Sequence, residues 1–427
     1  MKLARLALHA ALALGAAPMF SAAHAAITCD PDNGGLILPD GFCALVVAKD
    51  IGRARHIAVR PNGDLYVALN NAPDAPGGVM ALRDLDGDGR ADVMQKFGPT
   101  GGNGVAWSNG QLYFSPDDRV LRYDFAGDEL VPSAEPAVVV SGLPATGDHA
   151  RKTVVLDGQG TMYVNIASAS NTCQVENRVP FSPGVDPCPE LPIRAGVWQF
   201  LATGTNQVQS DGVRFVTETR NLNALAINPS DAQLYGVQNG RDQLFENWPT
   251  LFDARDDALK PAEELFRLEA GKAYGWPYCF YDPLQKRKVL APEYGGDGSI
   301  VGRCATRALP LDTYPAHWAP LSMLFYTGTQ FPKQYRGGLF IAFHGSRFDP
   351  SLQPAGPGFE VTFTRWTDRG PQGRFHAFAD GFAGGDPTPA GAAHRPVGLA
   401  QAADGSIFVS DDKAGWIWRV MYVGAEQ

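Results

Sequence analysis

The amino-acid sequence predicts an all-β protein built as a six-bladed β-propeller. Two observations lead to this prediction. The first is a pattern of an apolar strand, a tight turn and a second strand, which recurs along most of the chain. The second is the content of 48 glycines and 33 prolines in 427 residues without a Gly-X-Y period. Such a composition favours many short strands joined by turns over long helices.

The repeated unit is a hairpin whose turn is rich in Asn, Asp and Gly and whose second strand opens with Leu-Tyr or an equivalent pair. Asn-Gly and Asp-Gly supply the positive φ angles that a tight hairpin needs. The six copies lie at 57–67, 104–114, 154–164, 224–235, 320–343 and 397–409. Over about 400 residues, this spacing leaves room for roughly four strands per copy, which is typical of propeller blades. Unrelated hairpins in a β-sandwich would not share one turn chemistry.

Residues 1–25 are predicted to be a cleaved export signal. Lys2 and Arg5 precede the apolar run Leu6–Ala17, and a small-residue cleavage site ends at Ala25. The apolar run is too short to span a bilayer. We therefore expect a periplasmic or secreted protein without a membrane span.

The remaining residues, 26–427, are expected to form one propeller domain. Length alone would also allow two or three domains, but the repeats extend over the whole region. The formal net charge of −9 argues against nucleic acid or an anionic membrane surface as a partner.

Six cysteines follow the predicted signal, and an even number in an oxidising compartment predicts disulfides. Six cysteines allow 15 pairings. The simplest choice joins sequence neighbours as Cys29–Cys43, Cys173–Cys188 and Cys279–Cys304. The sequence contains no Cys-x-x-Cys-His motif for covalent haem and no Cys/His cluster with zinc spacing.

Polar residues stand just before the first strand of each repeat. They are Arg55-His56, Asn103, His149 with Arg151, Arg220-Asn221, His317 and His394-Arg395. Because the innermost strands of a propeller run along its axis, the starts of these strands converge at one mouth. An arginine-rich pocket in an acidic protein predicts a small polyanionic ligand.

Several motifs give the chain a family resemblance. They are Thr219-Arg-Asn221, Asn239-Gly-Arg-Asp242, Pro261-Ala-Glu-Glu-Leu265, Tyr274-Gly-Trp-Pro-Tyr-Cys279, Phe343-His-Gly-Ser-Arg347 and Arg395-Pro-Val-Gly398. Together they resemble the soluble sugar dehydrogenases that use pyrroloquinoline quinone (PQQ), in particular the L-sorbosone dehydrogenase-like branch. The resemblance runs from about Gly41 to Val423.

The resemblance implies a six-bladed propeller with PQQ beside a calcium ion at the mouth. His149 matches the family's general base, and Arg220 with calcium would polarise the quinone oxygen. Further matches are Arg55, Arg220, Arg395 and His344 for holding PQQ, Asn103 and Asn221 as amides against the quinone, and the backbone carbonyls of Gly240 and Arg241 for calcium. Backbone carbonyl oxygens suit a hard cation.

The chain departs from the family pattern at 167–173, where Ser, Ala and Asn replace a glycine-rich segment. The proline-rich insertion Gln174–Leu191 follows and is expected to shape the substrate entrance.

A second calcium candidate is separate from this pocket. Asp84, Asp86, Asp88 and Asp92 have the spacing of a calcium loop with Gly89 at the sixth position. Gln95 replaces the usual bidentate glutamate, and an Asp/Gly-rich exposed hairpin is the open alternative.

The function implied by the resemblance is oxidation of an aldose or keto-aldose that is sorbosone-, glucose- or pyranose-like. Hydride would pass to PQQ, and electrons would leave to a separate acceptor, a quinone or a cytochrome. One alternative is a calcium-dependent six-bladed lactonase or esterase, which requires several carboxylates around a channel calcium. Another is a non-catalytic propeller that binds a sugar or a protein.

Overall fold

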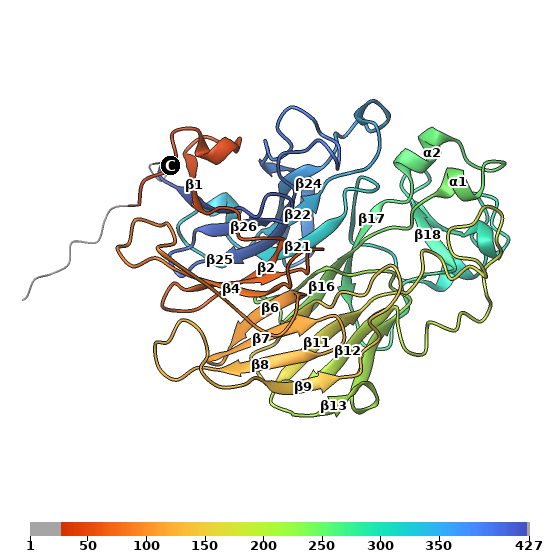
Figure 1. The fold of residues 1–427 in the computed structure, drawn as a ribbon. Coiled ribbons are helices and arrows are strands. Elements are labelled where there is room, and N and C mark those ends of the chain that lie inside the picture. Colours follow the sequence, from red (N-terminus) through yellow and green to blue (C-terminus); the bar gives the residue numbers. More distant parts are fainter. Residues whose placement is uncertain (1–26, 425–427) are drawn as a thin grey trace, which may run out of the picture.

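The computed structural model describes residues 27–424, which form six sheets arranged as a β-propeller (Figure 1). The predicted all-β, six-bladed fold is therefore confirmed. The export signal predicted at residues 1–25 lies outside the described residues. Between residues 27 and 424, no helix has the length and apolar character needed to cross a bilayer.

Each blade is built on a four-stranded antiparallel sheet. In five blades the strands follow chain order outward from the axis, and in the sixth the outermost strand comes from the N-terminal end of the described chain. Blade 1 contains β2 (Ala54–Val59), β3 (Leu65–Leu69), β4 (Gly78–Arg83) and β5 (Val93–Phe97). Blade 2 contains β6 (Gly102–Ser108), β7 (Gln111–Pro116), β8 (Val120–Asp124) and β9 (Ala137–Ser141), and the short β13 (Gln207–Val208) pairs in parallel with β9. Blade 3 contains β10 (Val154–Leu156), β11 (Thr161–Ile166), β12 (Gly196–Leu201) and β14 (Val213–Thr217).

Blade 4 contains β15 (Ala224–Asn228), β16 (Gln233–Gln238), β17 (Glu263–Leu268) and β20 (Asp312–Tyr314). Blade 5 contains β21 (Pro320–Phe325), β22 (Leu339–His344), β23 (Phe359–Thr367) and β24 (Gly370–Ala379). Blade 6 contains β25 (Pro396–Gln401), β26 (Ile407–Asp411), β27 (Ile417–Tyr422) and β1 (Phe42–Ala48). Each of the six sequence repeats thus provides the first two strands of one blade.

The ring closes because β1, from the N-terminal end of the described chain, forms the outer strand of the C-terminal blade. Phe42 is paired with Tyr422 in this sheet. The Phe42 ring also packs edge-on against Phe331 and Phe378 of blade 5, with centroids 4.8 and 5.0 Å apart. Strands from the two ends of the described chain are therefore paired within blade 6, and Phe42 packs this blade against its neighbour, blade 5.

The first strands of neighbouring blades contact one another around the axis. Four of them, β2, β6, β21 and β25, have a register shift at their start. Such bulges bend a strand and redirect its side chains. The predicted convergence of polar residues therefore occurs where the inner strands are irregular.

Tight turns join the first two strands of a blade. Asn109 and Gly110, with φ of 51° and 80°, link β6 to β7 between the paired residues Ser108 and Gln111. Two consecutive positive φ angles are what a two-residue hairpin requires.

Insertions within blade 4 lie on one side of the propeller, at the right of Figure 1. They include α1 (Leu244–Asn247), α2 (Ala254–Leu259) and the hairpin of β18 (Cys279–Asp282) and β19 (Arg287–Leu290). Short 3-10 helices occur at Asn33–Gly35, Gln209–Asp211, Pro292–Tyr294, Gly302–Thr306, Lys333–Tyr335 and Pro350–Leu352. The three disulfides join Cys29–Cys43, Cys173–Cys188 and Cys279–Cys304, which confirms the pairing of sequence neighbours.

Candidate functional site

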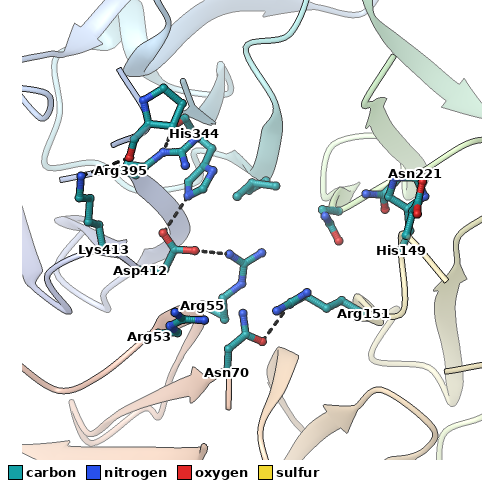
Figure 2. Close-up of a pocket in the computed structure, with 14 residues that line it drawn as sticks. Arg53, Arg55, Asn70, His149, Arg151, Asn221, His344, Arg395, Asp412 and Lys413 are labelled. Carbon is teal, nitrogen blue, oxygen red and sulfur yellow. Dashed lines mark hydrogen bonds and ion pairs between the residues drawn. The ribbon is translucent and has the colours of Figure 1, made fainter. Parts of the chain in front are cut away.

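A cavity of about 510 Å³ lies where the inner strands begin (Figure 2). Its cationic lining residues are Arg53, Arg55, Arg151, Arg395 and Lys413. Its carboxylates are Asp148 and Asp412. Five cations against two carboxylates leave an excess of three positive charges in a chain whose net charge is −9. This electrostatic contrast selects for an anionic ligand.

Arg55 is held on the cavity wall by partners on two sides. Its Nη1 donates to Asp412 Oδ2 at 2.7 Å, and its Nε donates to Asn103 Oδ1 at 2.8 Å. His344 Nε2 contacts the other oxygen of Asp412 at 2.7 Å. Burial alone would raise the pKa of Asp412, but the neighbouring His344 and Arg55 outweigh it and lower this pKa below its ordinary value. Burial lowers the pKa of His344, which favours a neutral imidazole.

Arg395 is fixed by uncharged acceptors. Its side-chain Nε donates to the backbone oxygen of His344 at 2.9 Å, and Nη2 donates to that of Gly345 at 3.2 Å. Its backbone N–H donates to Asp411 Oδ1 at 2.7 Å. Among residues 27–424, the orientation of the guanidinium is thus set by backbone oxygens and not by an ion pair on its side chain, and its charge remains available to a ligand.

His149 lies across the cavity from the cationic wall, which is formed by Arg55, Arg395 and Lys413 (Figure 2). Its Nδ1 is 3.0 Å from Ser168 Oγ and 3.1 Å from Ser168 O. Ser168 Oγ donates its own proton to the backbone oxygen of Ser170 at 2.8 Å. The Nδ1 atom must therefore carry a proton and donate it, which leaves the lone pair on Nε2. Burial, assisted by the charge of Arg220, lowers the pKa of His149 to about 3. The imidazole is therefore neutral, and Nε2 is its unprotonated nitrogen.

The structure places some of the predicted site residues on the cavity wall and others behind or beside it. Arg55, His149, Asn221, His344 and Arg395 line the cavity together. Asn103 has no exposed surface and lies behind Arg55, which it orients. Arg220 lines a separate small void beside the cavity.

The guanidinium of Arg220 is engaged by protein acceptors. Its Nη2 donates to Asp242 Oδ2 at 3.0 Å and to Asn171 Oδ1 at 3.1 Å. Asp242 in turn has a pKa well below its ordinary value, because His317 and Arg220 outweigh the effect of burial. Arg220 therefore provides a buried charge behind Asn221.

Gly240 and Arg241 line the same void as Arg220. Gly240 N donates to Glu263 Oε2 at 2.6 Å, and Arg241 Nη1 pairs with Glu293 Oε2 at 2.6 Å. Within the described part of the chain, neither carbonyl oxygen of these two residues accepts a hydrogen bond. Both carbonyls are thus free to ligate a hard cation.

The aspartate loop forms the turn between β4 and β5. Carboxylate oxygens of Asp84, Asp86 and Asp88 lie within 4.8 Å of one another. Many of these oxygens accept backbone N–H groups, and Asp92 Oδ2 accepts from Leu85 N at 2.7 Å. Asp84 lines a different cavity, of about 430 Å³. Calcium binding by this loop stays a prediction.

Three histidines of the predicted polar set are engaged elsewhere. His394 Nδ1 is 3.0 Å from Asp411 Oδ2, and His394 does not line the cavity. His56 Nε2 contacts the backbone oxygen of Leu321 at 2.8 Å, and burial lowers its pKa to about 4. His317 Nε2 contacts the backbone oxygen of Asp257 at 2.7 Å. Neither lines the cavity.

Sequence reasoning missed Asn70, Asp412 and Lys413 as lining residues. Asn70 follows β3 and Asp412 follows β26, just as the predicted His344 ends β22. In an antiparallel pair, the end of the second strand lies beside the start of the first. Polar residues directly after each second strand were therefore the signal that could have found them.

The comparison that decides the family concerns nearly the whole chain. A family model described as TrAA12-like matches residues 36–423. The chain belongs to the TrAA12-like family.

Solved structures support the fold of this TrAA12-like chain. The calcium structure of the Trichoderma reesei carbohydrate-active enzyme of family AA12 has a TM-score of 0.73 at 18% identity, covering 93% of this chain and 99% of that one. The holo PQQ domain of pyranose dehydrogenase from Coprinopsis cinerea has a TM-score of 0.70 at 18% identity, covering 90% and 97%. The PQQ-bound aldose sugar dehydrogenase from Streptomyces coelicolor has a TM-score of 0.54 at 14% identity, covering 90% and 99%.

A curated relative, an uncharacterized protein of Borreliella burgdorferi, is 32% identical to the TrAA12-like chain over 226 residues. The match covers 52% of this chain and 50% of the relative, so the chain spans about half the length of that protein.

Proposed function

We propose that this TrAA12-like chain is an exported sugar oxidoreductase that uses PQQ with a calcium ion beside it. Its substrate is an aldose or keto-aldose of the sorbosone, glucose or pyranose type. The names of the fold relatives, a PQQ domain of a pyranose dehydrogenase and a PQQ-bound aldose sugar dehydrogenase, support this proposal. The observation that carries it is the position of neutral His149 opposite a cationic wall in one cavity.

The cavity fits the cofactor in charge and size. PQQ has three carboxylates, and the lining has three more cations than carboxylates. A volume of about 510 Å³ lies within the usual range for a cofactor pocket. Arg55, Arg395 and Lys413 would hold the carboxylates, and His344 and Asn221 would contact the rest of the molecule. Asn103 would act by orienting Arg55.

Calcium would be held by the carbonyl oxygens of Gly240 and Arg241 together with oxygen atoms of the cofactor. The support for this part is that both carbonyl oxygens lack a hydrogen-bond donor among residues 27–424, and that Gly240 and Arg241 line a void together with Arg220. A structure of the Trichoderma reesei relative is also described as a calcium structure, which is consistent with a calcium ion in this proposal. Bound calcium would polarise the quinone oxygen.

The chemistry follows from the residues of the chain itself. Bound PQQ would supply a quinone that accepts a hydride. Oxidation of a sugar hydroxyl also releases a proton, and Nε2 of His149 is the atom available to accept it. Ser168 keeps the proton of the imidazole on Nδ1, so that Nε2 stays free. The buried charge of Arg220 would stabilise negative charge that develops nearby.

The cavity chemistry disfavours a lactonase or esterase. That activity needs several carboxylates free to bind calcium, whereas Asp412 is occupied by Arg55 and His344. Asp148 is paired with Arg178 at 2.8 Å.

The three disulfides support a location in an oxidising compartment, either the periplasm or the outside of the cell. The chain contains no covalent haem motif. Electrons would therefore leave to a separate quinone or cytochrome.

The test is reconstitution. The purified chain is titrated with PQQ in the presence and absence of CaCl₂, binding is followed by absorbance, and aldoses are assayed with an artificial electron acceptor. We expect saturable PQQ binding and sugar oxidation that depends on both additions. Absence of PQQ binding, or lactone hydrolysis without PQQ, would overturn the proposal.

A further inference from the structure

A single turn, residues 168–171, contacts both His149 and Arg220. At one end, Ser168 accepts the Nδ1 proton of His149, and its own backbone N–H donates to Arg220 O at 2.8 Å. At the other end, Asn171 accepts from Arg220 through its backbone oxygen at 3.3 Å and its side-chain oxygen at 3.1 Å. The proposed base and the buried charge are thus positioned by the same four residues.

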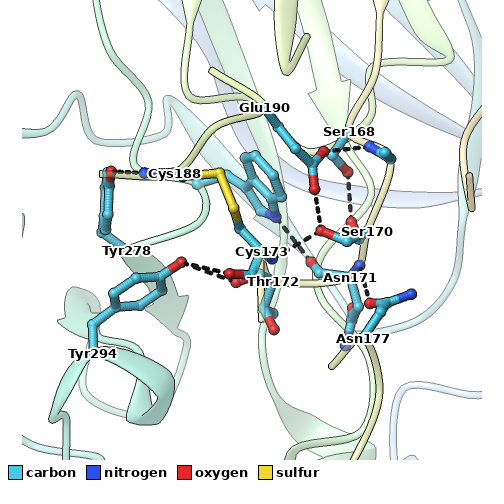
Figure 3. The surroundings of a disulfide bond; sticks show 12 residues. Ser168, Ser170, Asn171, Thr172, Cys173, Asn177, Cys188, Glu190, Tyr278 and Tyr294 are labelled. Atoms are coloured by element: carbon cyan, nitrogen blue, oxygen red, sulfur yellow. Dashed lines mark hydrogen bonds between the residues drawn. A yellow bond between two sulfur atoms is a disulfide. The ribbon is translucent and has the colours of Figure 1, made fainter. Parts of the chain in front are cut away.

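Glu190 holds the middle of this turn (Figure 3). One of its carboxylate oxygens accepts the backbone N–H of Ala169, and the other accepts the hydroxyl of Ser170. The backbone oxygen of Ala169 accepts from Asp148 N at 2.7 Å, next to His149 in the chain. Displacement of Glu190 would therefore release both the turn and the loop that carries His149.

The position of Glu190 is itself fixed by the insertion that contains it. The disulfide Cys173–Cys188 closes the loop two residues before Glu190 (Figure 3). The backbone N–H of Cys188 donates to Tyr278 Oη at 3.1 Å, and that of Cys173 donates to Ser170 Oγ at 2.9 Å. The disulfide that closes the insertion is therefore anchored to Ser170 of the turn on one side and to Tyr278 on the other.

We propose that Glu190 is a positioning residue for His149, because it fixes the turn that keeps the imidazole proton on Nδ1 and directs the Nε2 lone pair into the cavity. This inference rests on the proposed function only in that His149 is taken as the base.

A carboxylate is required at this position for a chemical reason. Its two oxygens accept the Ala169 N–H and the Ser170 hydroxyl at the same time. A glutamine of the same size has one acceptor oxygen and an NH₂ group that cannot accept. Glu190→Gln therefore preserves volume but removes the negative charge, and it leaves the Ser170 hydroxyl without an acceptor oxygen at this contact unless the hydroxyl turns to accept from the new NH₂ group.

The first measurement does not depend on cofactor or turnover. Nitrogen NMR of the imidazoles in the full chain without cofactor reports which ring nitrogen of His149 carries the proton, with His149→Ala used for assignment. Wild-type protein should show a single Nδ1–H form, and Glu190→Gln a mixture of tautomers. The matched control is Glu176→Gln, because Glu176 is an exposed glutamate on the same insertion. An unchanged tautomer in Glu190→Gln would overturn the proposal.

The second measurement uses the reconstituted protein. Glu190→Gln should lower kcat by about tenfold to a hundredfold through misplacement of the base, with the PQQ dissociation constant and KM unchanged. Equal kcat in Glu190→Gln and Glu176→Gln would also overturn it. If the wild type binds no PQQ, the proposed function fails, and the tautomer measurement alone decides the role of Glu190. If Glu190→Gln does not fold, Ser170→Ala replaces it, because this variant removes the contact between the Ser170 hydroxyl and Glu190. The histidine tautomer and kcat of Ser170→Ala are then measured in the same way.

Discussion

The guanidinium of Arg55 and the carboxylate of Asp412 form a 2.7 Å ion pair between the first and the last blade. Their side chains are 6% and 18% exposed, so the pair is largely shielded from water. Both residues line the cavity at the inner edges of these two blades. The same contact therefore links the stability of the propeller to the geometry of the proposed cofactor site.

Removal of one partner of this pair should destabilise the fold. Asp412→Ala leaves Arg55 buried without its counter-charge, and the expected loss in the free energy of unfolding is about 3 kcal/mol. Asp118→Ala is the control, because Asp118 pairs with Arg119 on the surface with both side chains at least 40% exposed. Its expected loss is below about 1 kcal/mol. Denaturant unfolding measures both, and equal losses would contradict the prediction.

The contribution of Asp412 should depend on pH. Its pKa is held below the ordinary value in the folded chain, so the stabilisation is fully present above the unfolded pKa of about 4. It should decline as the pH falls from there toward the folded pKa. The stability difference between wild type and Asp412→Ala is therefore expected to shrink between about pH 4 and pH 2 in urea unfolding. A constant difference over that range would show that the carboxylate is not held ionised by its neighbours.

His149→Ala should abolish turnover and leave cofactor binding intact. A general base contributes about 10²- to 10⁴-fold to the rate, and we expect a loss in kcat of that size. The PQQ dissociation constant should change little, because Arg55, Arg395 and Lys413 lie on the opposite wall. Exposed His376, on β24, provides the control variant His376→Ala. Substantial residual turnover in His149→Ala would remove this residue as the base.

Arg395→Ala should weaken PQQ binding. A charge-assisted hydrogen bond contributes about 1.5–3 kcal/mol, which corresponds to roughly a tenfold to hundredfold rise in the dissociation constant. Arg365→Ala, at an exposed arginine on β23, changes the net charge equally and should leave the constant unchanged. An absorbance titration distinguishes the two variants, and an unaltered PQQ titration in Arg395→Ala would remove Arg395 from the site.

The fold was largely readable from local sequence signals. Turn residues such as Asn109-Gly110 recur at matching places in the repeats, and each repeat supplies the first two strands of a blade. The outer strands carried no comparable repeated motif. β1 belongs to the last blade because it pairs with β27, for example Phe42 with Tyr422, and such pairing between distant parts of the chain leaves no local signal in the sequence.

The site was only partly readable. Polar residues at the starts of the inner strands were predicted to meet at one mouth of the propeller. Arg55, His149 and Arg395 do line one cavity there. It did not predict which side chains face the cavity, because bulges such as Gly102/Gly104 turn Asn103 behind Arg55. The partner carboxylate Asp412 comes from the other end of the chain, and no local pattern connects it to Arg55.

The most direct test of the account is the absorbance of PQQ bound to the wild-type chain, recorded without oxygen before and after an aldose is added with calcium present. If His149 is the base, the oxidised-quinone absorbance should be lost in the wild type and persist in His149→Ala, although both proteins bind PQQ. Bound PQQ that remains oxidised in the wild type with every aldose tested, or that is reduced equally well in His149→Ala, would contradict it.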